Sequence, residues 1–384
     1  MNLSLSKRIR AFEKAIERSE SQLLDMTFGY PIDLHADWME EYVSTIRYDL
    51  LTTVDAKVLH NNICDYFAQL FGYKDYFITT SASEALMIAI HSCVENQNDE
   101  IILFDYGFYS YPELIKSSKG KPIFAQRDAY ENPVIQSVFD CFSEKTRAVI
   151  ITQPENPLGR IFDKNELEQL CLFCIEKKVT LIVDHAFIES AFYGHTVNLL
   201  LDLDYNTFLK DLSWIVIGDT GKTVCLQGIK CGCLLVSDNL KEKIESWAHL
   251  FLFQSDRVKL FILSKILHDP RLESYKTELA TKMVENLKLL ASKLDTRVHI
   301  FYPQATPMVL LDISHFAMDD ISFTERLLQE ESVALMPGCY FVYGLEKQNH
   351  YQNAHVRIAI SRPKHVLEEA IFRINRFLSA LHQQ

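Results

Sequence analysis

The sequence contains no apolar run that approaches the roughly 20 residues needed to cross a membrane, so we expect no membrane-spanning segment. Its first residues include Arg and Lys but no apolar stretch, which argues against a secretory signal. Internal repeats, low-complexity tracts and linkers rich in proline or glycine are also missing. These absences exclude membrane and repeat architectures, and we expect a globular, cytoplasmic protein.

Cysteine pairing that would indicate a disulfide framework is missing as well. The nine cysteines are odd in number and scattered, as is typical of reduced cytosolic thiols in a long chain. Cys171 and Cys174 form a C-x-x-C pair, and Cys231 and Cys233 form a C-x-C pair. Redox or metal chemistry is one interpretation. Because no matching His or Cys pair lies nearby, we instead expect apolar residues within a helix and a strand, and no metal site.

Positive charge is in deficit, because 39 Lys and Arg face 51 Asp and Glu, for a formal net charge of −12. Such an acidic chain is a poor candidate for sequence-independent binding to nucleic acid or to anionic lipid. With 48% hydrophobic and 23% charged residues, the composition is that of a soluble globular protein. The length of 384 residues suits roughly two or three domain-sized units.

What the middle of the chain does contain is an alternation of buried strands and helices. Apolar runs at 148–152, 180–184 and 214–218 lack polar alternation, as expected of strands buried on both faces. Residues 81–96 and 165–178 have helical patterns between such strands. We therefore predict an α/β fold whose large domain has a mostly parallel, doubly wound sheet.

From about residue 240 the pattern changes to long helices, short strands and a last helix, which is typical of a smaller α+β domain. The N-terminal residues have apolar side chains at helical spacing but cannot form a core alone, so we expect them to pack with that domain. The predicted division is 1–45 for the N-terminal segment, 46–250 for the large domain and 251–384 for the small domain.

Ligands of such sheets lie beyond the carboxyl ends of the strands, so the polar residues that follow the strands are the candidates. They are Ser81, Ala82, Ser83, the segment 105–111, Asn156, Asp184 and Lys222. Low-dielectric surroundings lower the pKa of a lysine such as Lys222 and favour the neutral amine that attacks an aldehyde. A solvated surface lysine is the alternative. A phosphate loop is another, because GDTGKT resembles its end, but Val216 stands where that loop requires glycine.

Five elements, in this order, resemble the aminotransferase class I and II family of the aspartate aminotransferase superfamily, whose members are pyridoxal-phosphate (PLP) enzymes of fold type I. The elements are TTSASEAL, QPENPLGRIF, VDHAF, the lysine segment with Gly228, Lys230 and Gly232, and VRIAISR. The resemblance runs from about Tyr48 to Arg357, most of the chain. It implies that Lys222 forms a Schiff base with PLP.

The resemblance assigns the cofactor phosphate to Ala82 and Ser83, at a helix start whose N–H groups form an anion site. A serine N-cap would serve the same helix start. Lys230 stands where the family usually has an Arg, and it supplies charge without bidentate geometry. Tyr48 resembles a tyrosine that reaches the phosphate from the neighbouring subunit, which implies a homodimer.

Around the cofactor ring the resemblance assigns one aromatic residue and two polar ones. Phe108 matches the stacking residue, with a structural aromatic cluster as the alternative. Asn156 matches a donor to the phenolic oxygen, although N-P-L-G is also a good turn. Asp184 matches the carboxylate that pairs with the protonated pyridine nitrogen; its alternative role is to cap a helix.

The substrate α-carboxylate is assigned to Arg357, whose planar guanidinium suits a carboxylate bidentately. Asn156 is expected to contribute to the same substrate site. Arg362 lies close by in the sequence, and a surface position is the alternative for either arginine.

Several positions depart from the family pattern. Phe187 stands where a tyrosine donates to the phenolic oxygen, and this loss should make the imine easier to protonate. Asp219 and Gly221 replace the two serines of S-x-S-K. A carboxylate at 219 is repulsive to a phosphate unless it turns away or a lysine neutralises it. Gln153 replaces the first Asn of the N-P-x-N-P-x-G motif.

Together these residues predict a PLP enzyme of amino acid metabolism or biosynthesis, most simply an aminotransferase that uses an amino acid and a 2-oxo acid. One alternative is a PLP enzyme of the same fold that catalyses elimination, cyclisation, decarboxylation or oxidation. A non-catalytic binding protein that keeps the fold is the other, and the departures motivate it. The retained Lys222, Asp184, Asn156 and Arg357 argue for an enzyme.

Overall fold

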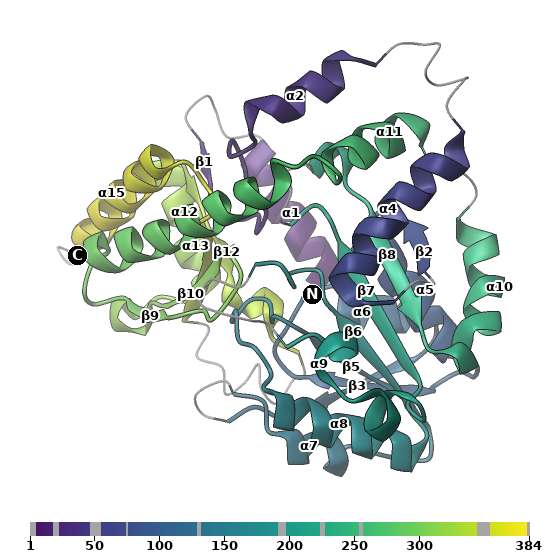
Figure 1. Ribbon diagram of the computed structural model, residues 1–384. Helices are drawn as coiled ribbons and strands as arrows, with labels where there is room; N and C mark the ends of the chain where they lie inside the picture. The colour runs from purple at the N-terminus through teal and green to yellow at the C-terminus, as the bar shows by residue number, and fades with distance from the viewer. Residues whose placement is uncertain are drawn as a thin grey trace.

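The computed structural model describes residues 5–17, 23–46, 55–73, 76–128, 132–190, 197–222, 227–252, 256–343 and 354–381. Its largest feature is a seven-stranded sheet with the order β2-β8-β7-β6-β5-β3-β4 (Figure 1). The strands are β2 (Tyr76–Thr79), β3 (Glu100–Phe104), β4 (Lys121–Ala125), β5 (Thr146–Thr152), β6 (Thr180–Asp184), β7 (Trp214–Asp219) and β8 (Gly232–Val236).

The strands from β3 to β7 pair in parallel, whereas β8 runs antiparallel to both of its neighbours, β7 and β2. The predicted α/β fold with a mostly parallel sheet is therefore confirmed.

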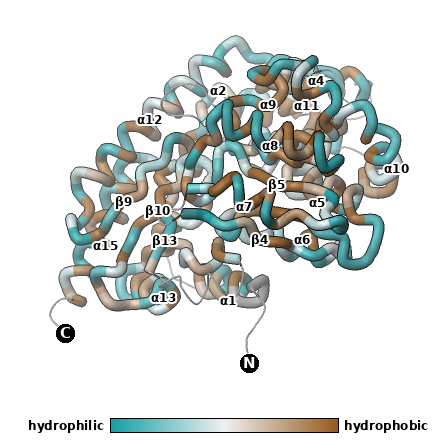
Figure 2. Tube along the Cα trace, turned by 90° about the horizontal axis from the view of Figure 1, so that it is seen from below, coloured by the Kyte–Doolittle hydropathy of each residue, from teal (hydrophilic) through white to brown (hydrophobic). Residues whose placement is uncertain are grey.

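Side chains of the central strands enter two different cores. Ile101 and Leu103 of β3 belong to one hydrophobic cluster, and Ile102 and Phe104 belong to another. Figure 2 shows hydrophobic strands around β5 between α8 and α6. The first face is covered by α5 (Ala82–Cys93), α6 (Tyr111–Ser117) and α10 (Lys241–Phe251). The second is covered by α4 (Ala56–Phe71), α7 (Ile135–Asp140), α8 (Lys164–Lys177) and α11 (Arg257–Ile266).

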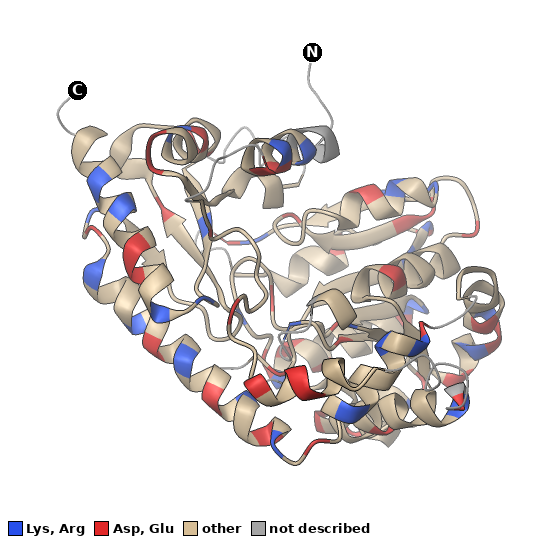
Figure 3. Cartoon of the chain, turned by 90° about the horizontal axis from the view of Figure 1, so that it is seen from above, with Lys and Arg blue, Asp and Glu red and all other residues tan. Residues whose placement is uncertain are grey.

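A smaller antiparallel sheet with the order β12-β13-β10-β9 has a hydrophobic core of its own, so the predicted smaller α+β part is confirmed. Its strands are β9 (His299–Phe301), β10 (Met308–Asp312), β12 (Met336–Pro337) and β13 (His355–Ala359). The helices packed on it are α12 (Leu272–Lys293), α13 (Asp320–Glu331) and α15 (Lys364–Leu381). Figure 3 shows acidic and basic residues interspersed along the outer helices.

The long helix α12 joins the two cores, because Leu279 and Met283 pack in the core of the large sheet and Leu287 and Leu290 pack in that of the small one. The predicted domain boundaries at 45 and 250 stay a prediction.

The N-terminal segment contacts both parts. In α1 (Leu5–Glu17), Ile9 and Phe12 are buried against residues of the smaller part such as Met336. The short strand β1 (Leu24–Asp25) pairs in parallel with β11 (Val333–Ala334). Helix α2 (Asp37–Ser44) instead places Met39 in the core of the large sheet.

Short helical turns complete the described part of the chain. They are α9 (Leu199–Asp202), a π-helical turn at Tyr205–Leu209, and 3₁₀ turns at Gln227–Ile229, Asp238–Leu240, Ser314–Phe316 and Gly338–Phe341. Among the described residues, no helix is both long enough and apolar enough for a membrane span.

The two cysteine pairs have no metal-ligand set around them, because the described residues contain no group of three or more potential ligands. Cys171 and Cys174 are buried in α8, and Cys231 and Cys233 are buried at the start of β8. All four are free thiols.

Candidate active site

The predicted site residues follow from the register of the large sheet. Asp184 at the end of β6 lies beside Thr152 of β5 and Ile217 of β7. On the other side of β7, Asp219 lies beside Gly232. Because these strand ends share one edge, their polar side chains meet at the carboxyl side of the sheet, as expected for a doubly wound fold.

Lys222 lies in the turn after β7 and is partly buried. Its ammonium nitrogen lies 5.3 Å from the centre of the Phe187 ring and 5.8 Å from that of Tyr30. Burial lowers the pKa of Lys222 below its usual value, while the charges of Asp219 and Asp184 oppose the shift. Such a lysine releases its proton more easily than an exposed one, which favours a nucleophilic amine.

Asp184 is buried, with 5% of its surface exposed. One carboxylate oxygen accepts the Tyr111 hydroxyl at 2.7 Å, and the other accepts the N–H of Ala186 at 2.9 Å. Burial raises the pKa of Asp184, and these two hydrogen bonds oppose the rise. A buried carboxylate held in this way stabilises a protonated ring nitrogen placed against it.

Tyr111 lies at the end of the candidate segment 105–111, but the sequence predicts no role for it. Its hydroxyl bridges Asp184 and the Thr152 side chain, 2.7 Å away. The tyrosine that begins α6 thereby fixes the orientation of the predicted ring partner.

Asn156 and Arg357 meet although 201 positions separate them, since Arg357 Nη1 donates to the Asn156 side-chain oxygen at 2.9 Å. Arg357 Nη2 donates to the backbone oxygen of Thr27, and the guanidinium lies 4.7 Å from the centre of the Phe341 ring. Its Nε is buried and has no hydrogen-bond partner among the described residues. Burial lowers the pKa of Arg357 to about 10. A buried cation with an unpaired donor is suited to a carboxylate ligand.

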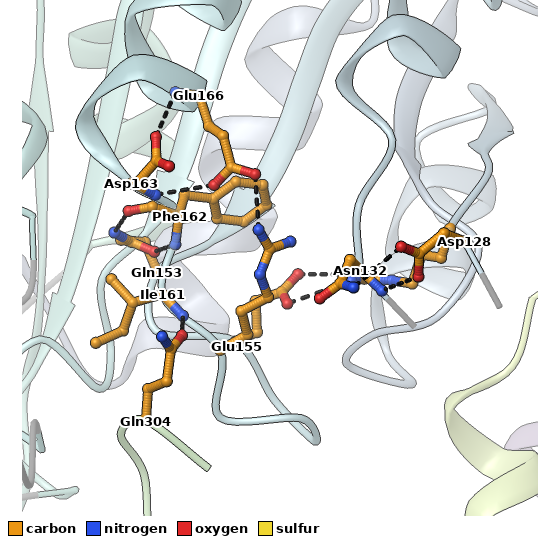
Figure 4. Close-up of polar contacts among 11 residues, drawn as sticks. Asp128, Asn132, Gln153, Glu155, Ile161, Phe162, Asp163, Glu166 and Gln304 are labelled. Atoms are coloured by element: carbon orange, nitrogen blue, oxygen red, sulfur yellow. Dashed lines mark hydrogen bonds and ion pairs between the residues drawn. The ribbon is translucent and has the colours of Figure 1, made fainter. Parts of the chain in front are cut away.

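The turn that carries Asn156 is fixed by Gln153 (Figure 4). The Gln153 amide donates to the backbone oxygen of Phe162 at 2.9 Å and accepts the Phe162 N–H at 2.8 Å. The Ile161 N–H donates to the Gln304 side chain at 2.8 Å. Gln153, which departs from the family motif, therefore holds the turn closed.

A buried ion pair supports the other side of the same turn. Arg127 pairs with Glu155 and also donates to the backbone oxygen of Tyr106 at 3.2 Å. The side chains of the pair are only 2% and 6% exposed, so removing one partner would leave a buried charge. The pair links the segment after β3 to Asn156.

The predicted phosphate site at the start of α5 contains a carboxylate. Asp219 accepts the N–H of Ala82 at 3.1 Å and the N–H of Gly221 at 2.5 Å. The expectation that a lysine neutralises this carboxylate, or that it turns away, is therefore incomplete, because backbone donors hold it. A Cβ on Gly221 would lie 2.8 Å from the Lys230 side chain, so Lys230 packs against the same turn.

Gly232 lets β8 pass close to the start of α5. A Cβ at this position would lie 2.5 Å from the carbonyl carbon of Ser81 and 2.7 Å from the nitrogen of Ala82. Because both neighbours are backbone atoms, Gly232→Ala is expected to lower the free energy of unfolding by about 1–3 kcal/mol, measured by denaturant titration.

Gly228→Ala is the matched control for this prediction, because a Cβ there meets no atom of the described residues within 4 Å. Equal stability of the Gly232→Ala and Gly228→Ala proteins would contradict the close approach.

The remaining predicted residues lie as follows. Ser83 is exposed in the first turn of α5, and Ser81, instead of Ser83, caps the helix by accepting the N–H of Glu84 at 3.4 Å. Phe108 is partly buried in the same cluster as the buried Phe187. Tyr48 lies outside the described residues, so its role stays a prediction.

The N-terminal segment contributes to the site in a way that the sequence did not indicate. Thr27 and Tyr30 contact Arg357 and Lys222, respectively. Arg362 holds this segment by donating to the backbone oxygens of Asp25, Phe28 and Tyr30. The alternative of a surface position is wrong for both arginines, since Arg357 is 4% and Arg362 is 2% exposed.

A hollow reaches Lys222 from the side of α12. Its lining includes Pro31, Ser361 and the Glu189–Lys276 pair, whose charged atoms are 2.5 Å apart.

The residues present fit pyridoxal phosphate. Lys222 offers an amine of lowered pKa for the aldehyde, and Asp184 offers a buried carboxylate for the ring nitrogen. The start of α5 is an anion site for the phosphate, although Asp219 uses it here. The unpaired Nε of Arg357 suits a substrate carboxylate.

Comparison with known proteins agrees with this geometry. The model of the family "Aminotransferase class I and II" matches residues 46–374. Aspartate aminotransferase of Sulfolobus acidocaldarius is 24% identical over 80% of this chain and 76% of that protein. Mouse kynurenine–oxoglutarate transaminase 1 is 22% identical over 78% of this chain and 76% of that protein. The crystal structure of an aromatic aminotransferase from Pyrococcus horikoshii superposes with a TM-score of 0.82 at 19% identity, covering 99% of this chain and 100% of that one.

Proposed function

Because this chain belongs to the family of class I and II aminotransferases and is a PLP-dependent aminotransferase, we propose that Lys222 is its cofactor-linking and proton-transferring residue. The observation that carries the proposal is the position of Lys222 beyond β7, with its pKa lowered by burial and Asp184 at the next strand end. When bound, PLP supplies an electron sink for the carbanion formed at the substrate α-carbon.

In this proposal the neutral amine of Lys222 would hold the cofactor by its aldehyde carbon, and the same amine would move the α-proton of the substrate. A lowered lysine pKa serves both roles, because each one requires an uncharged amine.

The other side chains orient the reactants. Asp184, fixed by Tyr111, keeps the ring nitrogen protonated. Arg357 receives the α-carboxylate through its unpaired Nε, and Asn156 holds the guanidinium in place. Phe108 and the Phe187 side chain supply apolar surface around the ring.

A spectroscopic half-reaction tests the proposal. The PLP-loaded protein is expected to lose its visible Schiff-base absorbance on addition of a suitable amino acid and to regain it with a 2-oxo acid. A panel of amino acids identifies the substrate class. A spectrum that responds to none of them would support a non-catalytic protein, and a response without recovery by 2-oxo acids would support another fate of the carbanion.

We further propose a homodimer in which Tyr48 of a second copy completes the phosphate site, and a cytoplasmic role in amino acid metabolism or biosynthesis. The free thiols of the described cysteines support a reducing compartment. Because the relatives named above are aminotransferases, we favour transamination over elimination, cyclisation, decarboxylation or oxidation.

A further inference from the structure

The carboxylate of Asp219 is built into the anion site at the start of α5. Asp219 ends β7, and its register partner Gly232 is also the partner of Thr79, the last residue of β2. This pairing brings the end of β7 beside the first turn of α5. Asp219 is 6% exposed, and both of its oxygens accept backbone N–H groups, those of Ala82 and Gly221.

A phosphate at the same helix start needs the same kind of donor. Helix N-termini hold anions through their free N–H groups, and few such groups are available in one turn. Here Ala82 already donates to Asp219, and Ser81 already accepts the N–H of Glu84. The Glu84 carboxylate also accepts the N–H of Thr80 at 2.6 Å. The helix start therefore has two acidic side chains around it before any phosphate arrives.

We propose that Asp219 is an intramolecular competitor of the cofactor phosphate, so that the phosphate contributes less to cofactor affinity than the helix N-terminus would otherwise allow. The phosphate must displace the carboxylate from Ala82, or bind with two like charges in contact. The positive charge of Lys230 in this region reduces that repulsion but is shared between two anions. This inference rests on the proposed function, because it takes PLP as the ligand.

The competing interpretation is that Asp219 is only a structural cap for α5 and for the turn that precedes Lys222. The two interpretations predict changes of opposite sign in the affinity for PLP when Asp219 is replaced. If Asp219 only caps the helix, its replacement loosens the site and weakens the binding of every ligand. If it competes with phosphate, its replacement strengthens the binding of phosphate-bearing ligands alone.

The experiment compares PLP with pyridoxal, which has the same ring and aldehyde but lacks the phosphate. Dissociation constants are measured by absorbance titration for the wild-type chain, Asp219→Asn and Asp219→Ser. The asparagine keeps the shape and one acceptor, and the serine replaces the carboxylate with a hydroxyl donor. The ratio of the dissociation constant of pyridoxal to that of PLP isolates the contribution of the phosphate to cofactor affinity.

We expect this ratio to rise about tenfold or more in both variants, because a like charge leaves a partly buried anion site. Asp319→Asn is the matched control, since Asp319 accepts the N–H of Ser322 at the start of α13, away from the site, and its loss changes the net charge equally. An unchanged or lower ratio in both Asp219 variants, with folding verified by circular dichroism, would overturn the proposal.

Failure of the proposed function is distinguishable from failure of this inference. Borohydride reduction followed by peptide mapping locates the lysine that carries the cofactor in each protein. If that lysine is not Lys222, the proposed function is wrong, whatever the ratio shows. If it is Lys222 and the ratio does not rise, only the role of Asp219 is wrong.

Discussion

Lys222→Ala is expected to abolish the covalent attachment of the cofactor and to lower turnover by at least about a thousandfold. The substitution removes both the amine that links PLP and the base that moves the α-proton. Positioned proton transfer alone contributes about 10²–10⁴-fold to an enzymatic rate. Visible absorbance before and after borohydride reduction reports the link, and steady-state kinetics with the amino acid that gives the strongest spectral response report the rate.

Lys282→Ala is the control for this substitution. Lys282 is about half-exposed on α12, where it pairs with Glu278 at 2.8 Å, and such surface pairs contribute little to stability. This variant is expected to behave like the wild-type chain. A Lys222→Ala protein that retains a borohydride-stable adduct and normal turnover would place the chemistry on another residue, and the proposed site would then be wrong.

The strand ends of the large sheet could be predicted from sequence because their signal is local. Runs without polar alternation, such as 180–184, indicate strands buried on both faces, and the structure buries every residue of β6. Asp184 is the last residue of one such run and Lys222 comes shortly after another, so a parallel sheet alone brings them to one edge. The short edge strand β4 was not predicted, because its residues are mostly half-buried and carry no comparable apolar run.

The position of the Asp219 carboxylate could not be predicted, because it depends on pairing between distant segments. Asp219, Gly232 and Thr79 are brought together by two antiparallel pairings, β7 with β8 and β8 with β2. Sequence patterns do not specify which strands become neighbours or how close a helix start lies to the next strand. The departure of Asp219 from the S-x-S-K motif could therefore be recognised in the sequence, but the contact of its carboxylate with Ala82 could not.

The roles of Gln153 and the N-terminal segment could not be predicted from sequence patterns either. Gln153 could be identified only as a replacement within a motif, whereas its function is to close a turn through two hydrogen bonds with Phe162. Thr27 and Tyr30 carry no recognisable pattern. They reach the site because Arg362 holds the backbone oxygens of Asp25, Phe28 and Tyr30 in their segment. Residues that act through backbone contacts leave little trace in side-chain patterns.

Arg357→Ala is expected to lower kcat/KM for amino acids by about 10²–10⁴-fold. The guanidinium is buried, and its Nε, which has no hydrogen-bond partner among the described residues, is available to a carboxylate. Two hydrogen bonds to a charged group contribute about 1.5–3 kcal/mol each, which corresponds to this range. Arg357→Lys is expected to recover only part of the loss, because an ammonium lacks the planar bidentate geometry.

The sharpest measurement for Arg357 uses a pair of substrates that differ in one group. An amine that lacks the α-carboxylate cannot use the guanidinium, so its slow turnover should be almost unchanged by Arg357→Ala while that of the amino acid collapses. Arg362→Ala is the control, since Arg362 holds the backbone of Phe28 and Tyr30; it should lower the free energy of unfolding without discriminating between the two substrates. If Arg357→Ala slows the turnover of both substrates equally, the role of Arg357 is structural, like that of Arg362. Only binding of the carboxylate by Arg357 would make the effect depend on the substrate.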